Sequence, residues 1–260
     1  MEIRGKKTAF LVVSFLLLLA GCTVVGKPQE ESKAVDLGRA KLVSTRIKMD
    51  TGKLEIAGGT DQLLEADFSY NVASWKPRID YEISGIRGEL TVEQPPGAKG
   101  APLGKVLYRW ELRLNEDVPM DLAINLGVGR SDFRLGDLLL ERLNIKAGAG
   151  NMDLDLTGKP SLISLNLDIG AGDVEVDLRG DWKDDLDASI KGGVGDVKLR
   201  LPGDVGVRVD ARRGIGDIHV KGLSKKAGAY VNRAYGRSGV TLHIDIKAGV
   251  GEISLEQEQN

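Results

Sequence analysis

The sequence predicts an all-β protein, in which a β-solenoid made of stacked rungs of about 22 residues follows a smaller N-terminal β module. Three observations predict this fold class. Glycine accounts for 34 of the 260 residues and aromatic residues for only 5%, a composition typical of turn-rich β proteins. A Gly-apolar-Gly motif recurs through the second half of the chain. Apolar and polar residues alternate between its copies, as they do in β-strands.

Residues 1–21 have the features of an export signal. The basic residues Arg4, Lys6 and Lys7 precede a mostly apolar stretch, residues 8–20, which is shorter than the ~17–25 residues of a membrane-spanning helix. A transmembrane helix is the alternative interpretation. We predict a signal peptide, and therefore a mature chain that faces outside the cytoplasm.

Cys22 directly follows Leu19, Ala20 and Gly21, and these four residues resemble the lipobox of bacterial lipoproteins. In that class, cleavage leaves the cysteine at the N-terminus with lipid on its thiol and its amine. The resemblance implies a lipid anchor at Cys22, the membrane as a partner, and a location at the cell membrane or the outer membrane. A chance match behind an ordinary export signal is the alternative. Since Cys22 is the only cysteine, no intrachain disulfide is possible.

The next two segments are a polar tether, residues 22–35, and an N-terminal β module, residues 36–118. Within the module, Ile47, Met49, Leu54 and Ile56 alternate with polar residues on either side of Gly52, which predicts a rung related to the later repeats. Further short strands are expected at residues 65–70, 78–81, 88–93 and 106–114. We expect this module to cap the open end of the solenoid.

Residues 119–256 form the predicted solenoid, and residues 257–260 a tail. The six motif copies begin at Gly127, Gly148, Gly170, Gly193, Gly214 and Gly249, with spacings of 21, 22, 23, 21 and 35 residues. One such unit cannot bury its own apolar face, so the units must stack, in chain order by the simplest expectation. Apolar positions step by two within a unit but by three from Ala171 to Val174, which predicts a corner at Gly172 with the apolar residues on both sides of it pointing inward. The residues expected to face one interior are Val174, Val176, Val197, Leu199, Ile218 and Val220.

Arg213 interrupts this inward pattern. It is the charged residue at a position that is otherwise apolar or glycine, and its expected neighbour on the preceding rung is Gly192. The missing side chain of Gly192 would leave room for a buried guanidinium, which would need hydrogen-bond partners. A local register shift or an exposed Arg213 stem is equally compatible with the sequence.

The long interval between the fifth and sixth copies holds a candidate binding loop, residues 223–239. It contains no acidic residue, although the chain without residues 1–21 carries a net charge of −4. Such a loop would attract anionic envelope polymers or lipid headgroups. The alternative is a closing segment whose tyrosines pack on the terminal rung. The candidate binding residues of the loop are Lys225, Lys226, Tyr230, Arg233, Tyr235 and Arg237.

The sequence offers little enzymatic chemistry. The Gly-apolar-Gly copies lack the third glycine and the following helix of a dinucleotide-binding motif, no Gly-x-Ser-x-Gly motif occurs, and the only two histidines fall on opposite sides of the corner. We predict no catalytic residue, no cofactor, and, without a basic domain, no nucleic-acid partner. Four acidic residues at equivalent corners are weak metal candidates, but we expect solvated charge and no metal there; they are Asp173, Asp196, Asp217 and Glu252.

The segments 47–56 and 108–115, combined with repeated Gly-apolar-Gly-Asp rungs, resemble those of bacterial toast-rack proteins. The C-terminal part is similar to adhesin-like β-solenoids and to cell-wall-active antibiotics response proteins. The resemblance covers most of residues 40–256. It implies a role at the cell surface or in envelope stress, and it brings no catalytic residue with it.

These observations predict a non-enzymatic, lipid-anchored cell-envelope protein that acts as a scaffold or binding surface, with an envelope polymer or a surface protein as a further partner. The alternative is an enzyme that acts on extracellular polysaccharide, because parallel β-helices host such enzymes. Asp, Arg and Lys side chains that converge in one cleft would favour the enzyme. A flat surface of mixed charge would favour the scaffold.

Overall fold

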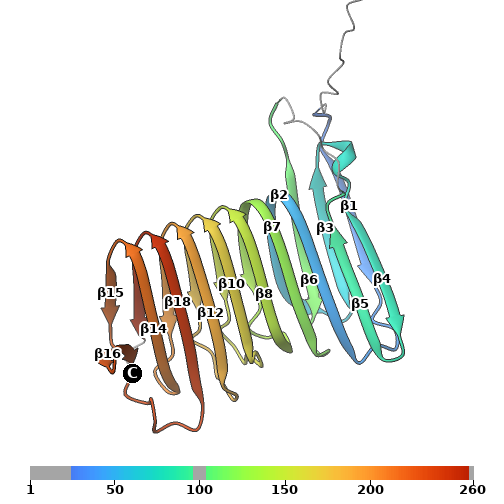
Figure 1. Ribbon diagram of the computed structural model, residues 1–260. Coiled ribbons are helices and arrows are strands. Elements are labelled where there is room, and N and C mark those ends of the chain that lie inside the picture. Colours follow the sequence, from blue (N-terminus) through green and yellow to red (C-terminus); the bar gives the residue numbers. More distant parts are fainter. Residues whose placement is uncertain (1–24, 96–103, 258–260) are drawn as a thin grey trace, which may run out of the picture.

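The computed structural model describes residues 25–95 and 104–257 (Figure 1). Within these residues the chain is almost entirely β-strand, and the helical element is a single 3-10 turn, η1 (Ala73–Trp75). The all-β class predicted from the sequence is confirmed. The strands are β1 (Gln29–Val35), β2 (Leu42–Thr60), β3 (Leu64–Tyr70), β4 (Arg78–Ser84), β5 (Arg87–Glu93), β6 (Tyr108–Asn115), β7 (Met120–Arg134), β8 (Leu140–Ala149), β9 (Met152–Asp155), β10 (Ser164–Ala171), β11 (Val174–Asp177), β12 (Leu186–Val194), β13 (Val197–Leu201), β14 (Gly206–Ile215), β15 (Ile218–Lys221), β16 (Ser224–Lys226), β17 (Ala229–Val231), β18 (Thr241–Val250) and β19 (Ile253–Gln257).

Strand pairing arranges the chain in two layers, which we call layer A and layer B. Layer A contains β4, β5, the first half of β2, the first half of β7, and then β8, β10, β12, β18 and β14. Layer B contains β1, β3, β6, the second halves of β2 and β7, and then β9, β11, β13, β19 and β15. Each rung crosses from layer A to layer B at a glycine corner, and the apolar core lies between the layers.

The glycine corners are required by the close approach of successive rungs. Gly172 has φ +125° and Gly195 has φ +131°, in the region that L side chains rarely adopt. A Cβ at Gly172 would overlap the carbonyl oxygen of Gly150, and one at Gly195 would overlap that of Gly172. The repeated motif is therefore a backbone requirement of the stack.

The core consists largely of aliphatic side chains stacked in register from rung to rung. Ile145, Leu167, Ile190 and Ile246 lie opposite one another on β8, β10, β12 and β18, and each is at most 1% exposed. The predicted inward positions Val174, Val176, Val197 and Leu199 are buried too. Ile218 and Val220 pack against the same core but are only half-buried, because β15 is the last strand of layer B.

The rung predicted around Gly52 is confirmed. Ile47, Met49, Leu54 and Ile56 on β2 are all buried. The strand β2 pairs in parallel with β7 over residues 43–57, through the corner and into both layers. The repeated architecture therefore begins inside the N-terminal segment.

The stacking order differs from the chain order at the C-terminal end. Strand β18 pairs with β12 on one side and with β14 on the other, and β19 lies in the same way between β13 and β15. In Figure 1 the red strand β18 lies between the orange strands β12 and β14. The expectation of stacking in chain order is wrong here: the last rung in sequence is the second-to-last rung in space. Residues 223–239 make this possible, because they carry the chain back across the terminal rung.

The residue between the two glycines also differs from the expectation. The step of three at the corner predicts an inward position for this residue, but Val194 is 56% exposed and Ile215 is 71% exposed. The corner turns so sharply that the middle residue lies on its outer side.

The tether predicted for residues 22–35 is wrong in its second half. Gln29–Val35 form β1, which pairs antiparallel with β3 along its whole length. The polar side chains of this segment suit an edge strand, since most of them are exposed. The predicted domain boundary at residues 118–119 falls between β6 and β7 and stays a prediction.

Candidate functional site

The four acidic metal candidates lie in one line along the layer B side of the corners. Their spatial order is Asp173, Asp196, Glu252 and Asp217, because the last two rungs are interleaved. Asp173 Oδ1 accepts a hydrogen bond from the backbone N–H of Asp196 at 3.1 Å, and Asp196 Oδ1 accepts one from the N–H of Glu252 at 2.8 Å. The first member of this chain is Asn151, whose Oδ1 accepts from the N–H of Asp173 at 3.3 Å.

These hydrogen bonds give the corner carboxylates a role that needs no ion. Asp173 and Asp196 each satisfy a backbone donor on the next rung, and such bonds are strong because the acceptor is charged. The outer members have basic neighbours: Arg213 lies 3.5 Å from Asp217, and His219 lies 3.4 Å from Glu252. Across residues 25–95 and 104–257, no group of three or more His, Cys, Asp or Glu side chains is arranged to hold a metal.

Arg213 is exposed, and its neighbour across the strands is Ala248 on β18. Ala248 in turn lies beside Gly192, so the expected contact between Arg213 and Gly192 is wrong. Interleaving of the last rung is the reason. The guanidinium pairs with Asp217 at the corner and needs no buried partner.

The candidate binding loop contains a β-hairpin, β16 and β17, whose turn is Ala227 and Gly228, both with positive φ. Strand β17 pairs with β14, so the hairpin covers part of the open edge of layer A. Lys225, Lys226, Arg233 and Arg237 are exposed, and none of them forms an ion pair with a carboxylate of the described residues. Their role in binding stays a prediction.

The two tyrosines of the loop have structural contacts. Tyr230 packs against the core and carries the ammonium of Lys225 5.6 Å from its ring centre. Tyr235 is half-buried, and a hydrogen bond to it, together with Asp210, raises the pKa of Arg208. The loop therefore combines fixed aromatic side chains with cations that have no carboxylate partner among the described residues.

Asn232 is an anchoring residue of this loop that the sequence analysis missed. It is 6% exposed, and its Oδ1 accepts hydrogen bonds from the N–H groups of Val207 and Tyr235, both at 3.0 Å. Its Nδ2 donates to the carbonyl oxygen of Val205 at 2.7 Å. A polar residue in a basic loop carries no sequence signal for this role, because its partners outside the loop lie about 25–30 residues earlier in the chain.

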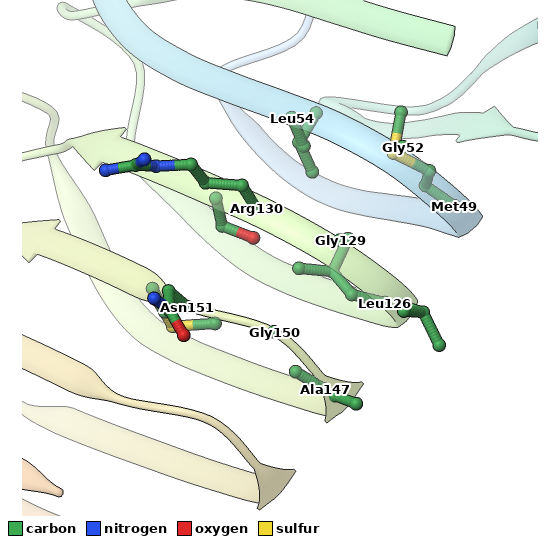
Figure 2. Close-up of a pocket in the computed structure, with 13 residues that line it drawn as sticks. Met49, Gly52, Leu54, Leu126, Gly129, Arg130, Ala147, Gly150 and Asn151 are labelled. Atoms are coloured by element: carbon green, nitrogen blue, oxygen red, sulfur yellow. The ribbon is translucent and has the colours of Figure 1, made fainter. Parts of the chain in front are cut away.

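The best-formed cavities in the described part of the protein are small or open to solvent. The cavity at the corner between β2, β7, β8 and β9 has a volume of about 10 Å³, which is room for about one water. Figure 2 shows Met49, Leu54 and Leu126 among the side chains around it. The larger hollows lie on open outer surfaces; one of about 310 Å³ lies on layer B over β7, β9, β11 and β13.

Charges in the hollow on layer B are paired across the strands. Arg200 contacts both Glu175 and Asp177, and Arg179 binds Asp177 at 2.6 Å. Burial alone would raise the pKa of Asp177, but hydrogen bonds from Arg179, and the charges of Arg179 and Arg200, bring it below its ordinary value. The arrangement suits a structural network, since a catalytic acid would need a raised pKa.

The anchor prediction concerns residues that the structure leaves undescribed. Cys22 and the predicted signal, residues 1–21, lie outside the described residues, so both predictions stand as such. Among the described residues, no helix is long and apolar enough to cross a membrane.

The chain is similar to several solved structures, to different degrees. A proposed cell adhesion protein from Clostridium sporogenes ATCC 15579 is 31% identical, with a TM-score of 0.70 over 89% of this chain and 100% of that one. A proposed adhesin from Bacteroides fragilis NCTC 9343 is 12% identical, with a TM-score of 0.33 over 88% of this chain and 97% of that one. A proposed lipid-binding protein from Parabacteroides distasonis ATCC 8503 is 11% identical, with a TM-score of 0.33 over 91% and 99%. No curated protein matches the chain.

The family comparison agrees with the architecture. The model of the N-terminal domain of toast_rack, DUF2154, matches residues 24–162 and 159–200, and these ranges include the rung on β2 and the following rungs through β12. Together with the 31% identity over the whole length of the Clostridium protein, this match shows that the chain belongs to the toast-rack family.

Proposed function

We propose that this protein is a lipid-anchored, non-enzymatic binding scaffold of the cell envelope, with an adhesion-like role. The observation that carries the proposal is the unbroken two-layer stack, in which every rung pairs with its neighbours. Such a stack holds its outer faces rigidly over a long surface, as extended binding proteins do. The similarity to the proposed cell adhesion protein of Clostridium supports the same role.

A polysaccharide-active enzyme is less well supported. Glycosidases need a general acid and a second carboxylate set around a bound sugar ring. On layer B the carboxylates of Glu175 and Asp177 are instead bound by arginines in a shallow, open hollow. Carboxylates paired with arginines in an open hollow support the scaffold over the enzyme.

The anchor is tested by replacing the single cysteine. We expect Cys22→Ser to abolish metabolic labelling with a radioactive fatty acid and to release the protein from the membrane fraction, because the thiol is the attachment atom. Unchanged labelling would show that lipid attachment at Cys22 is wrong.

Binding by the loop is tested with a full-length variant in which Lys225, Lys226, Arg233 and Arg237 are replaced by Glu. We expect weaker retention of isolated envelope polymer at low salt with a nearly unchanged thermal midpoint, since all four side chains are exposed. The matched control replaces four exposed cations elsewhere: Lys41, Arg78, Arg87 and Lys159. Equal loss in both variants, or a midpoint lowered by several degrees in the loop variant alone, would contradict a binding role for the loop.

A further inference from the structure

The residues at the middle of the corners form a line along the outer side of the stack, and those in the paired-glycine motifs lie between two glycines. Strand pairing places them in the order Thr51, Val128, Ala149, Ala171, Val194, Val250 and Ile215. Four of them are large and well exposed, and we call these four the corner ridge: Val128 at 59%, Val194 at 56%, Val250 at 44% and Ile215 at 71%.

The corner ridge is unusual because its members are aligned. Scattered exposed aliphatic side chains are normal on protein surfaces, whereas aligned ones indicate an interaction site. Val194, Val250 and Ile215 lie on adjacent strands, about 4.8 Å apart. The flanking glycines carry no side chain that could cover them.

A row of cations follows the ridge on layer A. Lys191, Lys247 and Arg212 lie side by side on adjacent strands, with all three side chains exposed. Like charges directly opposite each other destabilise a sheet. Arg212 lies 3.5 Å from Asp245, and Lys191 has Asp168 opposite it on β10, whereas Lys247 has cations opposite it on both sides. This flank therefore favours an anionic surface.

The acidic flank on layer B opposes this attraction only in part. Asp173 and Asp196 are occupied by backbone N–H groups of the next rung. Glu252 and Asp217 have His219 and Arg213 as neighbours. The two flanks therefore differ in sign: the layer A flank presents the cation row, whereas the layer B flank keeps carboxylate charge, because a backbone N–H is neutral and does not cancel the charge of its acceptor.

The described chain begins on the same side of the molecule as the corners. Gln29 on β1 pairs with Tyr70 on β3, and Tyr70 pairs with Tyr108 on β6. The carbonyl oxygen of Tyr108 packs directly against Gly52, the corner glycine of β2. Figure 1 shows β1 starting at the edge where the rungs turn.

The chain length limits the distance to the anchor. Gly26 is held by a 2.7 Å hydrogen bond from its N–H to the carbonyl oxygen of Asn71. Val25 lies three residues after Cys22, a span of at most about 10 Å. A lipid on Cys22 would therefore hold the ridge side of the protein toward the bilayer.

We propose that the corner ridge is a membrane-facing edge, which rests on the headgroup region of the bilayer that holds the anchor. The aliphatic side chains would contact the boundary with the acyl chains, and the cation row would contact anionic headgroups. This inference rests on the proposed lipid anchor at Cys22. It adds an orientation: the opposite edge of the stack faces away from the membrane.

The test uses the full-length lipidated protein in vesicles of phosphatidylethanolamine and phosphatidylglycerol. A nitroxide label is placed at Val194→Cys and, as the matched control, at Ile163→Cys, which is 47% exposed at the opposite end of the rungs. The measurement is the electron spin relaxation of the label. We expect oxygen, which enters lipid, to speed the relaxation at 194 more than a water-soluble nickel complex does. The label at 163 should show the reverse preference. Replacing Lys191 and Lys247 by Glu should remove the lipid preference at 194, whereas replacing Lys41 and Lys159 by Glu should leave it unchanged.

The outcomes separate the ridge from the anchor. Mass spectrometry of the same sample reports whether Cys22 carries lipid. If it does and the label at 194 behaves like the label at 163, or is shielded from both reagents as by a polymer or a second copy, the membrane-facing ridge is wrong while the anchor stands. If Cys22 carries no lipid, the anchor is wrong. The same labels in a Cys22→Ser background then decide the ridge alone: a lipid preference at 194 supports it, and its absence refutes it.

Discussion

The N-terminal module and the repeated rungs stabilise the same two-layer architecture by different means. Between β1 and β6, the core is built around aromatic side chains in mutual contact: the rings of Phe68 and Trp110 lie 5.4 Å apart, as do those of Trp75 and Tyr108. Burial raises the pKa of Tyr108, whose hydroxyl donates a 2.6 Å hydrogen bond to the carbonyl oxygen of Trp75. From β7 onward the core is mostly aliphatic and repeats from rung to rung.

The two regions depend on different kinds of residue for their structure. A repeated rung can use interchangeable aliphatic side chains, because the shape of the rung is set by glycine at the corner, where no Cβ fits. The module mixes antiparallel and parallel strands that do not repeat. Its layers are held in place by large rings of defined shape. Stability should therefore depend mainly on side-chain volume in the module and on glycine backbone conformation in the repeated rungs.

The largest effect is expected for Trp110→Ala in the module. Trp110 is 0% exposed and contacts both Phe68 and Tyr108, so truncation leaves a large cavity and should lower the free energy of unfolding by about 4 kcal/mol. Urea denaturation followed by intrinsic fluorescence measures it. Trp110→Phe keeps most of the ring volume and should cost clearly less. Equal losses for the two variants would contradict the dependence on ring volume.

Gly195→Ala tests whether the rungs require glycine at the corner. The added methyl group would meet the carbonyl oxygen of Gly172 at a positive φ, and we expect a loss of about 3 kcal/mol from overlap and backbone strain. Gly239→Ala is the control, because nothing lies within 4 Å of its added Cβ. The denaturation curve also tests the boundary at residues 118–119: one shared transition in this variant and in Trp110→Ala would mean that the module and the rungs unfold together.

Asn232→Ala tests the C-terminal end of the stack, where the rungs do not follow one another in chain order. It leaves the buried N–H of Val207 without its side-chain acceptor and removes the donor to Val205, so we expect a loss of about 2 kcal/mol. Thermal denaturation is the measurement. Asn166→Ala, which removes an exposed hydrogen bond to Asn144, should change stability by less than about 0.5 kcal/mol. A similar midpoint for both variants would show that Asn232 does not hold the loop.

The smallest effect is expected for Asp177→Asn and depends on pH. Because the pKa of Asp177 in the folded protein lies below its ordinary value of 3.8, its ionised form stabilises the fold above that pH, and this contribution disappears as the pH falls through the lowered pKa. At pH 7 we expect Asp177→Asn to cost about 1–2 kcal/mol, with the difference from the wild type shrinking below pH 3.8. Urea denaturation at pH 7, 4 and 3 measures this. Asp181→Asn, whose ion pair with Lys183 is exposed, should show little dependence. A constant difference for Asp177→Asn would exclude a role of its charge.

Local patterns were sufficient to predict most of the rung strands and most of their inward faces. Alternation around Gly52 predicted the rung on β2, and the period of the glycines predicted the corners, because both depend on residues that are neighbours in the chain. The exposed cations of the loop could be identified in the same way. The strand β1 could not, since its polar side chains look like a linker until β3 supplies the pairing partner.

The sequence by itself determined the repeat, the all-β class and the positions where only glycine fits, because these follow from the backbone conformation and apolar face of one rung. Only the tertiary structure decided the order of the last rungs, the outward turn of Val194 and Ile215, and the contacts of Asn232. Every rung offers similar strand edges and a similar apolar face, so local patterns cannot distinguish one neighbour from another. The choice of β18 as the partner of both β12 and β14 depends on the path of residues 223–239 over the terminal rung.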